Sequence, residues 1–203
     1  MNHELAQKYI ACMEEIKKRT SVVTALARGE VNLMYLMTTA ESAALQTRKI
    51  LELIALSSLV ANREQYSKSR ANFHKDWHAT RILDKLKQVN PKFFPVPTRQ
   101  VKISQGWYDT PPIDSGYLTQ EDFIELYDEC STLLHSKNPF SKKSDYDART
   151  FLFKDIPMWI DKIIVLLNHH HVFPVDDSRM YIVLMQAQSD GKVHFAEFEK
   201  ITN

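Results

Sequence analysis

The chain has 203 residues, of which 44% are hydrophobic and 25% charged, and its formal net charge at pH 7 is +1. This composition is that of a globular domain rather than a disordered chain, and the near-neutral charge gives no overall field toward nucleic acid or membrane. With only 4 glycines, the chain contains none of the patterns GxGxxG, GxxxxGK[ST] and GxSxG. These common nucleotide-binding and hydrolase signatures are therefore excluded.

Two further features concern the cellular compartment. Cys12 and Cys130 have no CxxC spacing, and the first residues lack the apolar core of a secretory leader. The longest apolar stretch, over 33–60, is interrupted by four charged residues, which is typical of a buried helix rather than a membrane span. We therefore expect a cytoplasmic protein with no membrane segment.

The first half of the chain has the periodicity of helices. Apolar residues recur at helical spacing over 4–27, and Gly29 stands where a left-handed cap would end that helix. A second helix is predicted over 32–61. A third is predicted over 75–89, where Asn90-Pro91 would stop it.

Residues 91–118 differ from the rest, because they contain five prolines and two glycines together with five aromatic residues. This composition predicts an irregular arm, with a short strand at Val101–Ser104. A loop of this length in a compact domain is either functional or packed, and the aromatic residues favour an arm that packs over the bundle.

The last third of the chain changes from helical to strand periodicity. Thr119 and Asp122 form an imperfect capping box for a helix over 120–135, and Pro157 is expected at the first position of a helix over 157–170. Alternating apolar and polar residues, with an Asp190-Gly191 turn, then predict a three-stranded antiparallel meander. Its strands are expected at 171–175, 179–187 and 192–199.

Together these elements predict a mainly α fold. An antiparallel bundle of about five helices is expected over residues 1–170, including the Pro-rich arm at 91–118. A small C-terminal antiparallel β-meander over 171–203 is expected to pack on the bundle, so that the whole forms one compact unit.

Charge is balanced overall but separated along the chain. Residues 68–102 contain nine basic and two acidic side chains, whereas residues 103–136 contain seven acidic side chains and no lysine or arginine. Solvated faces, or faces that meet within the fold, are one interpretation. The other is a nucleic-acid-binding face on the third helix, on which basic and aromatic side chains alternate. Its candidate residues are Lys75, Arg81, Lys85, Trp77 and His78.

Metal and nucleophile patterns are incomplete. His74 and His78 are four apart, but no further ligands accompany them, and His169–His171 are expected at a helix end, where the dipole favours histidine. Residues 186–197 resemble a calcium loop without two of its carboxylates and are better explained as a hairpin turn. Acidic neighbours should raise the pKa of Cys130. No metal and no cofactor is expected.

Two segments carry a resemblance to a known family. LQTRKILELIA contains Arg48 and Glu52 four apart, and LYDECSTLLHSKNP ends with His135 and Asn138-Pro139. This layout resembles the HEPN superfamily of prokaryotic helical bundles over about residues 30–168, and it is similar to bacterial and phage proteins of the same layout. The ribonuclease members of that superfamily need R-x4–6-H, and the arginine is missing ahead of His135.

The resemblance therefore implies a non-catalytic HEPN-like interaction module that binds a protein or nucleic-acid (RNA or DNA) partner and forms a homodimer. One alternative is a divergent ribonuclease or nucleotide-handling enzyme, in which His135 would act with Arg48 and Asn138. If no such site exists, Arg48 and Glu52 are expected to form a simple ion pair, and His135 is expected to cap the end of its helix. A third hypothesis is a phage or mobile-element protein that acts on a host defence factor.

Overall fold

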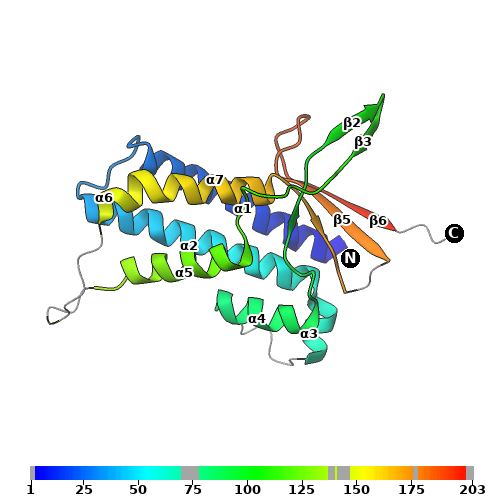
Figure 1. Cartoon of the computed structure of the whole chain (residues 1–203), viewed down its shortest axis with the longest axis horizontal. Coiled ribbons are helices and arrows are strands. Elements are labelled where there is room, and N and C mark those ends of the chain that lie inside the picture. The colour runs from blue at the N-terminus through cyan, green and yellow to red at the C-terminus, as the bar shows by residue number, and fades with distance from the viewer. Residues whose placement is uncertain (1–2, 70–77, 137–139, 141–146, 176–177, 200–203) are drawn as a thin grey trace.

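Two long antiparallel helices form the centre of a computed structural model that describes residues 3–69, 78–136, 140, 147–175 and 178–199. They are α1 (His3–Ala27) and α2 (Leu36–Ala61), which lie side by side (Figure 1). Gly29 has a φ of 72°, and its N–H donates to the Leu26 carbonyl, so the predicted left-handed cap is confirmed. Helix α2 begins four residues later than predicted, because Met34, with a φ of 67°, cannot belong to a helix.

The remaining helices pack around this pair. They are α3 (Arg63–Ser69), α4 (Ala79–Val89), α5 (Gln120–Leu133), α6 (Ala148–Thr150), the π-helix η2 (Phe151–Asp155) and α7 (Ile156–Leu167). The capping box of α5 is confirmed, because Thr119 and Asp122 each accept a hydrogen bond of 3.1 Å from the other's backbone N–H. Helix α3 was not expected from the sequence.

Helix α7 begins at Ile156, one residue before the predicted start, with Pro157 in its first turn, but it continues α6 and η2 without a break from Ala148. A proline interrupts the regular ladder of helix hydrogen bonds. Here the wider π turn precedes it, and the Ile156 N–H donates to the Phe151 carbonyl, so the helix continues past the proline.

The sheet has four strands, one more than predicted, and all its pairs are antiparallel. Its order is β1 (Val96–Pro97), β4 (His169–Val172), β5 (Arg179–Leu184) and β6 (His194–Glu199). The first strand comes from the Pro-rich arm, and the boundary expected at 171 falls inside β4. The helix predicted to reach 170 ends at Leu167, because β1 and β5 supply backbone partners to residues 169–172 on both sides.

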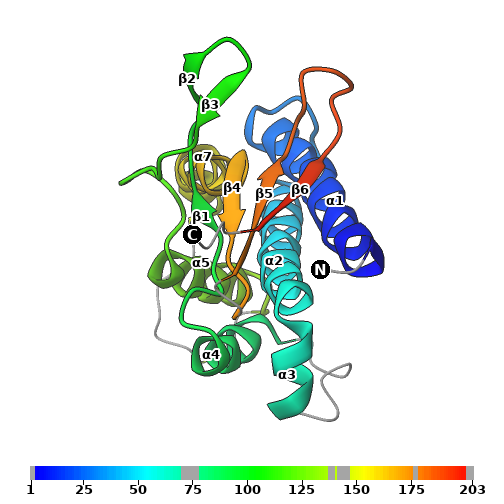
Figure 2. The same cartoon turned by 90° about the vertical axis from the view of Figure 1, so that its right-hand side faces the viewer.

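Beyond β1 the arm forms a two-stranded hairpin of β2 (Val101–Ser104) and β3 (Trp107–Asp109), which confirms the strand predicted at 101–104. The prediction that the whole arm packs on the bundle is only partly right. Phe93 and Phe94 are buried, but the hairpin projects away from the bundle on the same side as the turn between β5 and β6 (Figures 1 and 2).

The inner face of the sheet packs on α1. Across β4, β5 and β6 this face presents His170, Val183 and Phe195 in register, and the Tyr9 ring of α1 lies 5.6 Å from that of Phe195. The outer face carries the next set of paired residues. There His169 of β4 pairs with Leu184 of β5, which pairs in turn with His194 of β6. The two faces therefore place consecutive histidines of β4 in different surroundings.

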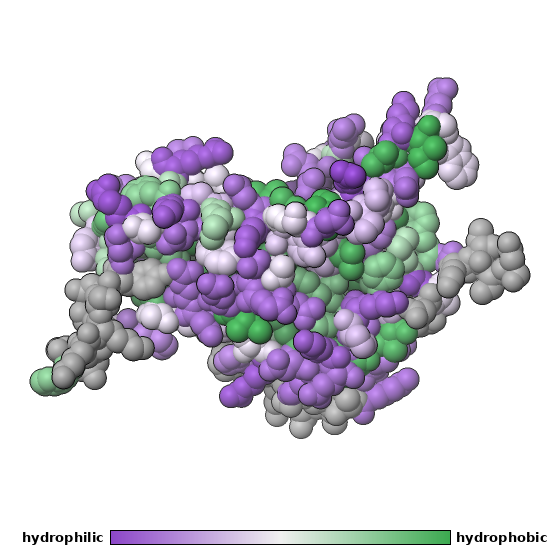
Figure 3. All heavy atoms as spheres, in the orientation of Figure 1, coloured by the Kyte–Doolittle hydropathy of each residue, from purple (hydrophilic) through white to green (hydrophobic). Residues whose placement is uncertain are grey.

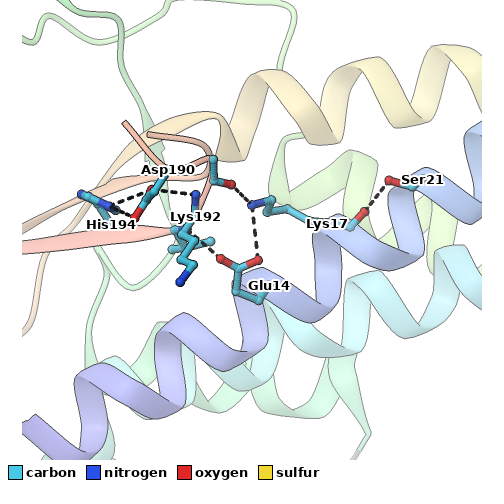
Figure 4. A network of polar contacts seen from close by, with 8 residues as sticks. Glu14, Lys17, Ser21, Asp190, Lys192 and His194 are labelled. Atoms are coloured by element: carbon cyan, nitrogen blue, oxygen red, sulfur yellow. Dashed lines mark hydrogen bonds and ion pairs between the residues drawn. The ribbon is translucent and has the colours of Figure 1, made fainter. Parts of the chain in front are cut away.

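A polar network joins the turn between β5 and β6 to α1 (Figure 4). The Lys17 ammonium donates to the Gly191 carbonyl at 2.6 Å, and the Val193 N–H donates to the Glu14 carboxylate at 2.7 Å. Asp190, the predicted turn residue, accepts from the Lys192 N–H at 2.9 Å. Residues 186–193 thus form a turn whose polar groups bond within the protein.

The mainly α fold with a C-terminal antiparallel sheet is the predicted fold class. Among the residues that the structure describes, no helix combines the length and the apolar character needed to cross a membrane.

Candidate functional site

The structure places Arg48 in a polar cluster between α2 and α5. Its guanidinium forms the expected ion pair with Glu52 at 3.3 Å, donates to the Tyr127 hydroxyl at 3.2 Å and lies 5.0 Å from the centre of that ring. The His78 ring lies 5.8 Å from Tyr127. Arg48 and His78, predicted for two different sites, thus both contact Tyr127.

The enzyme hypothesis names three residues, of which the structure describes His135 and Arg48. His135 lies just beyond the end of α5, is exposed, and makes no hydrogen bond or ion pair with Arg48 in the described part of the chain. Its backbone N–H donates to the Thr132 carbonyl at 3.3 Å, but no side-chain cap is seen among the described contacts. Asn138 lies outside the described residues.

The predicted nucleic-acid-binding face falls only partly within the structure. Arg81 is exposed and Lys85 half-buried on α4, whereas Lys75 and Trp77 lie outside the described residues. His78 precedes α4 as its N-cap residue rather than lying inside the predicted helix, and its ring nitrogen Nδ1 is 3.2 Å from the Thr80 hydroxyl.

A cleft on the outer side of the sheet is a stronger candidate site. It consists of two adjoining pockets of about 680 and 370 Å³, each of which lies within the range of ligand-binding pockets. One wall is the arm at 98–113, the opposite wall is the end of β5 with the following turn and β6, and the end of α7 closes the base. His169, Gln100, Tyr108 and Leu184 line both pockets.

The lining of the cleft is apolar and amide-rich, with positive but no negative groups. Ile164, Ile182 and Phe198 supply apolar surface, and exposed glutamines supply hydrogen-bonding groups. Arg99 is the charged side chain of the described lining, which also contains His169 and His194 and no carboxylate. Such a surface accepts a planar ligand that is neutral or anionic.

The hairpin above the cleft carries large apolar side chains that are exposed to an unusual extent. Trp107 is 73% exposed, Ile103 70% and Tyr108 55%, and apolar atoms are visible on the projecting hairpin in Figure 3. Lys102 and Tyr108 are partners in the β2–β3 register, so both lie on the same face of the hairpin. An exposed apolar and aromatic surface of this kind is typical of a binding site.

His169 forms the floor of the cleft and is only 5% exposed. Its Nδ1 lies 2.5 Å from the Thr98 hydroxyl, whereas its Nε2 has no hydrogen-bond partner in the described part of the chain. His171, on the same face, has a ring centre 6.0 Å away, and its Nε2 likewise lacks a described partner. Burial lowers the pKa of both imidazoles, so both are neutral at pH 7.

His170 points to the inner face and is completely buried and fully bonded. Its Nδ1 donates to the Leu167 carbonyl at 2.8 Å, and its Nε2 accepts from the Tyr9 hydroxyl at 2.8 Å. Burial lowers the pKa of His170 to about 4 and raises that of Tyr9. The prediction of surface or helix-end histidines at 169–171 is therefore wrong, because all three are buried in a strand.

Neither cysteine has the surroundings of a reactive thiol. Burial raises the pKa of Cys130, and Glu129 adds to this effect more than Arg48 opposes it. Burial alone raises the pKa of Cys12 to about 11. Within the described residues, no three histidine, cysteine or carboxylate side chains gather to hold a metal ion.

The amino-acid sequence alone does not predict the cleft. Its walls come from three distant segments, and the alternation of His169 and His171 becomes informative only once residues 169–172 are known to be a strand. Comparison with protein families, curated proteins and solved structures finds no match to this chain.

Proposed function

We propose that the chain is a non-catalytic, HEPN-like interaction module that binds a single-stranded nucleic acid in the cleft between the β2–β3 hairpin and the outer face of the sheet. The observation that carries the proposal is the exposed Tyr108, which lines both pockets, together with the exposed Trp107 next to it on the hairpin and a cleft lining that contains Arg99 and no carboxylate.

The chemistry of this surface fits a strand with unpaired bases. Flat aromatic side chains stack on bases whatever their identity, and each such contact contributes about 1–3 kcal/mol. Arg99 in the cleft wall and Lys102 on the same hairpin face as Tyr108 are placed to neutralise phosphates. A pocket of about 680 Å³ is large enough for a single base.

Fluorescence anisotropy with a labelled single-stranded RNA 10-mer tests the proposal. We expect binding that weakens as salt rises and that falls about tenfold in Trp107→Ala and Tyr108→Ala. Tyr35→Ala is the matched control, because Tyr35 is equally exposed (64%) but lies between α1 and α2 rather than among the cleft residues.

The same experiment distinguishes the alternatives. A wild-type protein that ignores RNA and DNA single strands at low salt contradicts the proposal and leaves a protein partner as the occupant of the hairpin surface. Cleavage of the RNA that disappears in His135→Ala would favour the enzyme instead.

A further inference from the structure

The two edges of the sheet differ in how far the protein closes them. The edge strand β1 is two residues long and contains Pro97, which has no N–H and whose carbonyl accepts from the Ile113 N–H at 2.9 Å. The other edge strand, β6, is six residues long, contains no proline and pairs regularly with β5. Among the residues that the structure describes, no strand pairs with its other side (Figure 2). Proteins usually shield such an edge, because it is a site to which another strand can add.

The hydrogen bonds of the neighbouring strands show which backbone groups of β6 point outward. The Met185 N–H donates to the Asn168 carbonyl at 2.9 Å, on the side of β4. Backbone groups of successive residues in a strand point to alternate sides, so those of Leu184 point to β6, where its partner is His194. By the same alternation along β6, the N–H and C=O of Phe195 point away from β5, toward the edge of the sheet.

Symmetry limits how a second, identical strand can pair with this edge. Two copies of an antiparallel strand are related by a two-fold axis, and residues directly opposite each other point to the same face of the sheet. Phe195 and Glu197 lie on the inner face, and Ala196 and Phe198 on the outer face. Inner residues must therefore meet inner residues, so the registers with the longest overlap are centred on Ala196 or on Glu197.

The side chains of β6 favour the register centred on Ala196. Centring on Glu197 would place that carboxylate directly opposite its own copy, which is destabilising. Centring on Ala196 pairs Phe195 with Glu197 of the second copy and His194 with Phe198 of the second copy, so no like charges are opposite. The backbone groups of Ala196 point to β5, so the axis is a non-hydrogen-bonded position, where opposite Cα atoms approach to about 4.5 Å. A methyl side chain fits this close approach.

The exposure and the charges of the strand agree with such a pairing. Ala196 is exposed, and Phe198 is 48% exposed although it is a large apolar residue. Arg179 of β5 lies 3.3 Å from the Glu197 carboxylate and 4.0 Å from that of Glu199, so both negative charges are balanced within one chain. The edge therefore presents a second copy with little charge of one sign.

We infer that the edge of β6 binds a second copy of this chain, and that the two sheets join into one antiparallel sheet across a two-fold axis at Ala196. The inference does not depend on nucleic-acid binding. Both outer faces then lie on the same side of the joined sheet. Because His194 lines the smaller pocket of the cleft, Phe198 of the second copy would lie next to that pocket.

Sedimentation velocity of the full chain without RNA tests the inference. We expect a monomer at about 1 µM and a dimer at about 200 µM, because a single strand pair is a small interface of low affinity. Ala196→Lys and Ala196→Glu each place like charges at the axis, so each alone should weaken dimerisation at least about tenfold. An equal mixture of the two variants should restore the dimer, since lysine then faces glutamate. Urea unfolding verifies that each variant is folded.

Thr132→Lys is the matched control, because Thr132 is exposed on α5, which packs on α2 rather than on the sheet. It adds the same charge as Ala196→Lys and should leave dimerisation unchanged. A wild-type chain that stays monomeric at the higher concentration would overturn the inference. So would a dimer that persists in both Ala196 variants, one that their mixture fails to restore, or one that Thr132→Lys also abolishes. All four results leave the proposed function standing, since none of them involves RNA.

Discussion

The two faces of the C-terminal sheet use the same residue type in opposite ways. On the inner face, His170 is completely buried, and both of its ring nitrogens are bonded, to Tyr9 and to the Leu167 carbonyl. On the outer face, its neighbour His169 lines a cleft, and among the described residues only its Nδ1 has a hydrogen-bond partner. The inner face is thus closed by the protein's own hydrogen bonds, whereas on the outer face His169 Nε2 has no partner among the described residues.

The largest expected difference between the two faces is in how the free energy of unfolding depends on pH. The pKa of His170 is about 4 in the folded protein and about 6.5 when the chain is unfolded, so between these values the unfolded chain binds a proton that the folded protein does not. The free energy of unfolding should therefore decrease as the pH falls from about 6.5 to 4, by about 3 kcal/mol from this group alone. Urea unfolding over that pH range measures it.

The variant His170→Asn isolates this contribution. Asn can still donate to the Leu167 carbonyl but does not titrate, so the variant should be less stable at pH 7 and show a flatter dependence on pH. His169 and His171, whose pKa values are lowered by burial, and carboxylates such as Glu14, whose pKa is lowered by the Val193 N–H, contribute to the slope that remains. An unchanged slope in the variant would contradict the assignment to His170.

A smaller effect is expected when the inner-face hydrogen bond is removed. Tyr9→Phe deletes the hydroxyl that donates to His170 Nε2 and leaves that nitrogen buried and unpaired. The free energy of unfolding should fall by about 2 kcal/mol, as measured by urea unfolding at pH 7. RNA binding should not change, because Tyr9 lies on α1 beneath the sheet, and a large loss of affinity would show that the two faces are coupled.

The corresponding change on the outer face should cost less. Thr98→Val removes the hydroxyl bonded to His169 Nδ1 with little change of shape. We expect a loss of about 1 kcal/mol in the same unfolding assay, because solvent entering the adjoining cleft can partly replace the hydroxyl. A loss equal to or greater than that of Tyr9→Phe would mean that the outer face is as closed as the inner one.

The smallest effect is expected from His135, the residue at the centre of the enzyme hypothesis. Its side chain is exposed beyond the end of α5 and makes none of the described hydrogen bonds. His135→Ala should leave both the urea midpoint and the affinity for single-stranded RNA unchanged. A loss of RNA affinity in a normally stable variant would move the binding site to the end of α5.

What the sequence predicted correctly depends on local contacts. The Thr119–Asp122 capping box and the left-handed Gly29 are each defined by a few neighbouring residues, and both occur as predicted. The strand at 101–104 has its partner only a few residues further along the chain. In such cases the residue types alone determine which backbone groups are satisfied.

The errors concern contacts between distant segments. The strand predicted at 171–175 begins two residues earlier, at His169, because β1, some 70 residues earlier in the chain, and β5 bond to residues 169–172. The cleft is assembled from the arm, the end of α7 and the strands β5 and β6. That His169 Nε2 has no partner among the described residues depends on which groups lie around it in space, so no sequence pattern could reveal it.

Ultraviolet crosslinking of a 4-thiouridine-labelled RNA 10-mer, followed by mass spectrometry of the peptides, tests most directly whether the outer face of the sheet is the binding site. The account predicts adducts on peptides that contain Trp107 and Tyr108, on those that cover 164–171, or on both, and their loss when unlabelled oligo-U competes. Adducts confined to α4 around Arg81 and Lys85, or to the segment between α1 and α2, would contradict it.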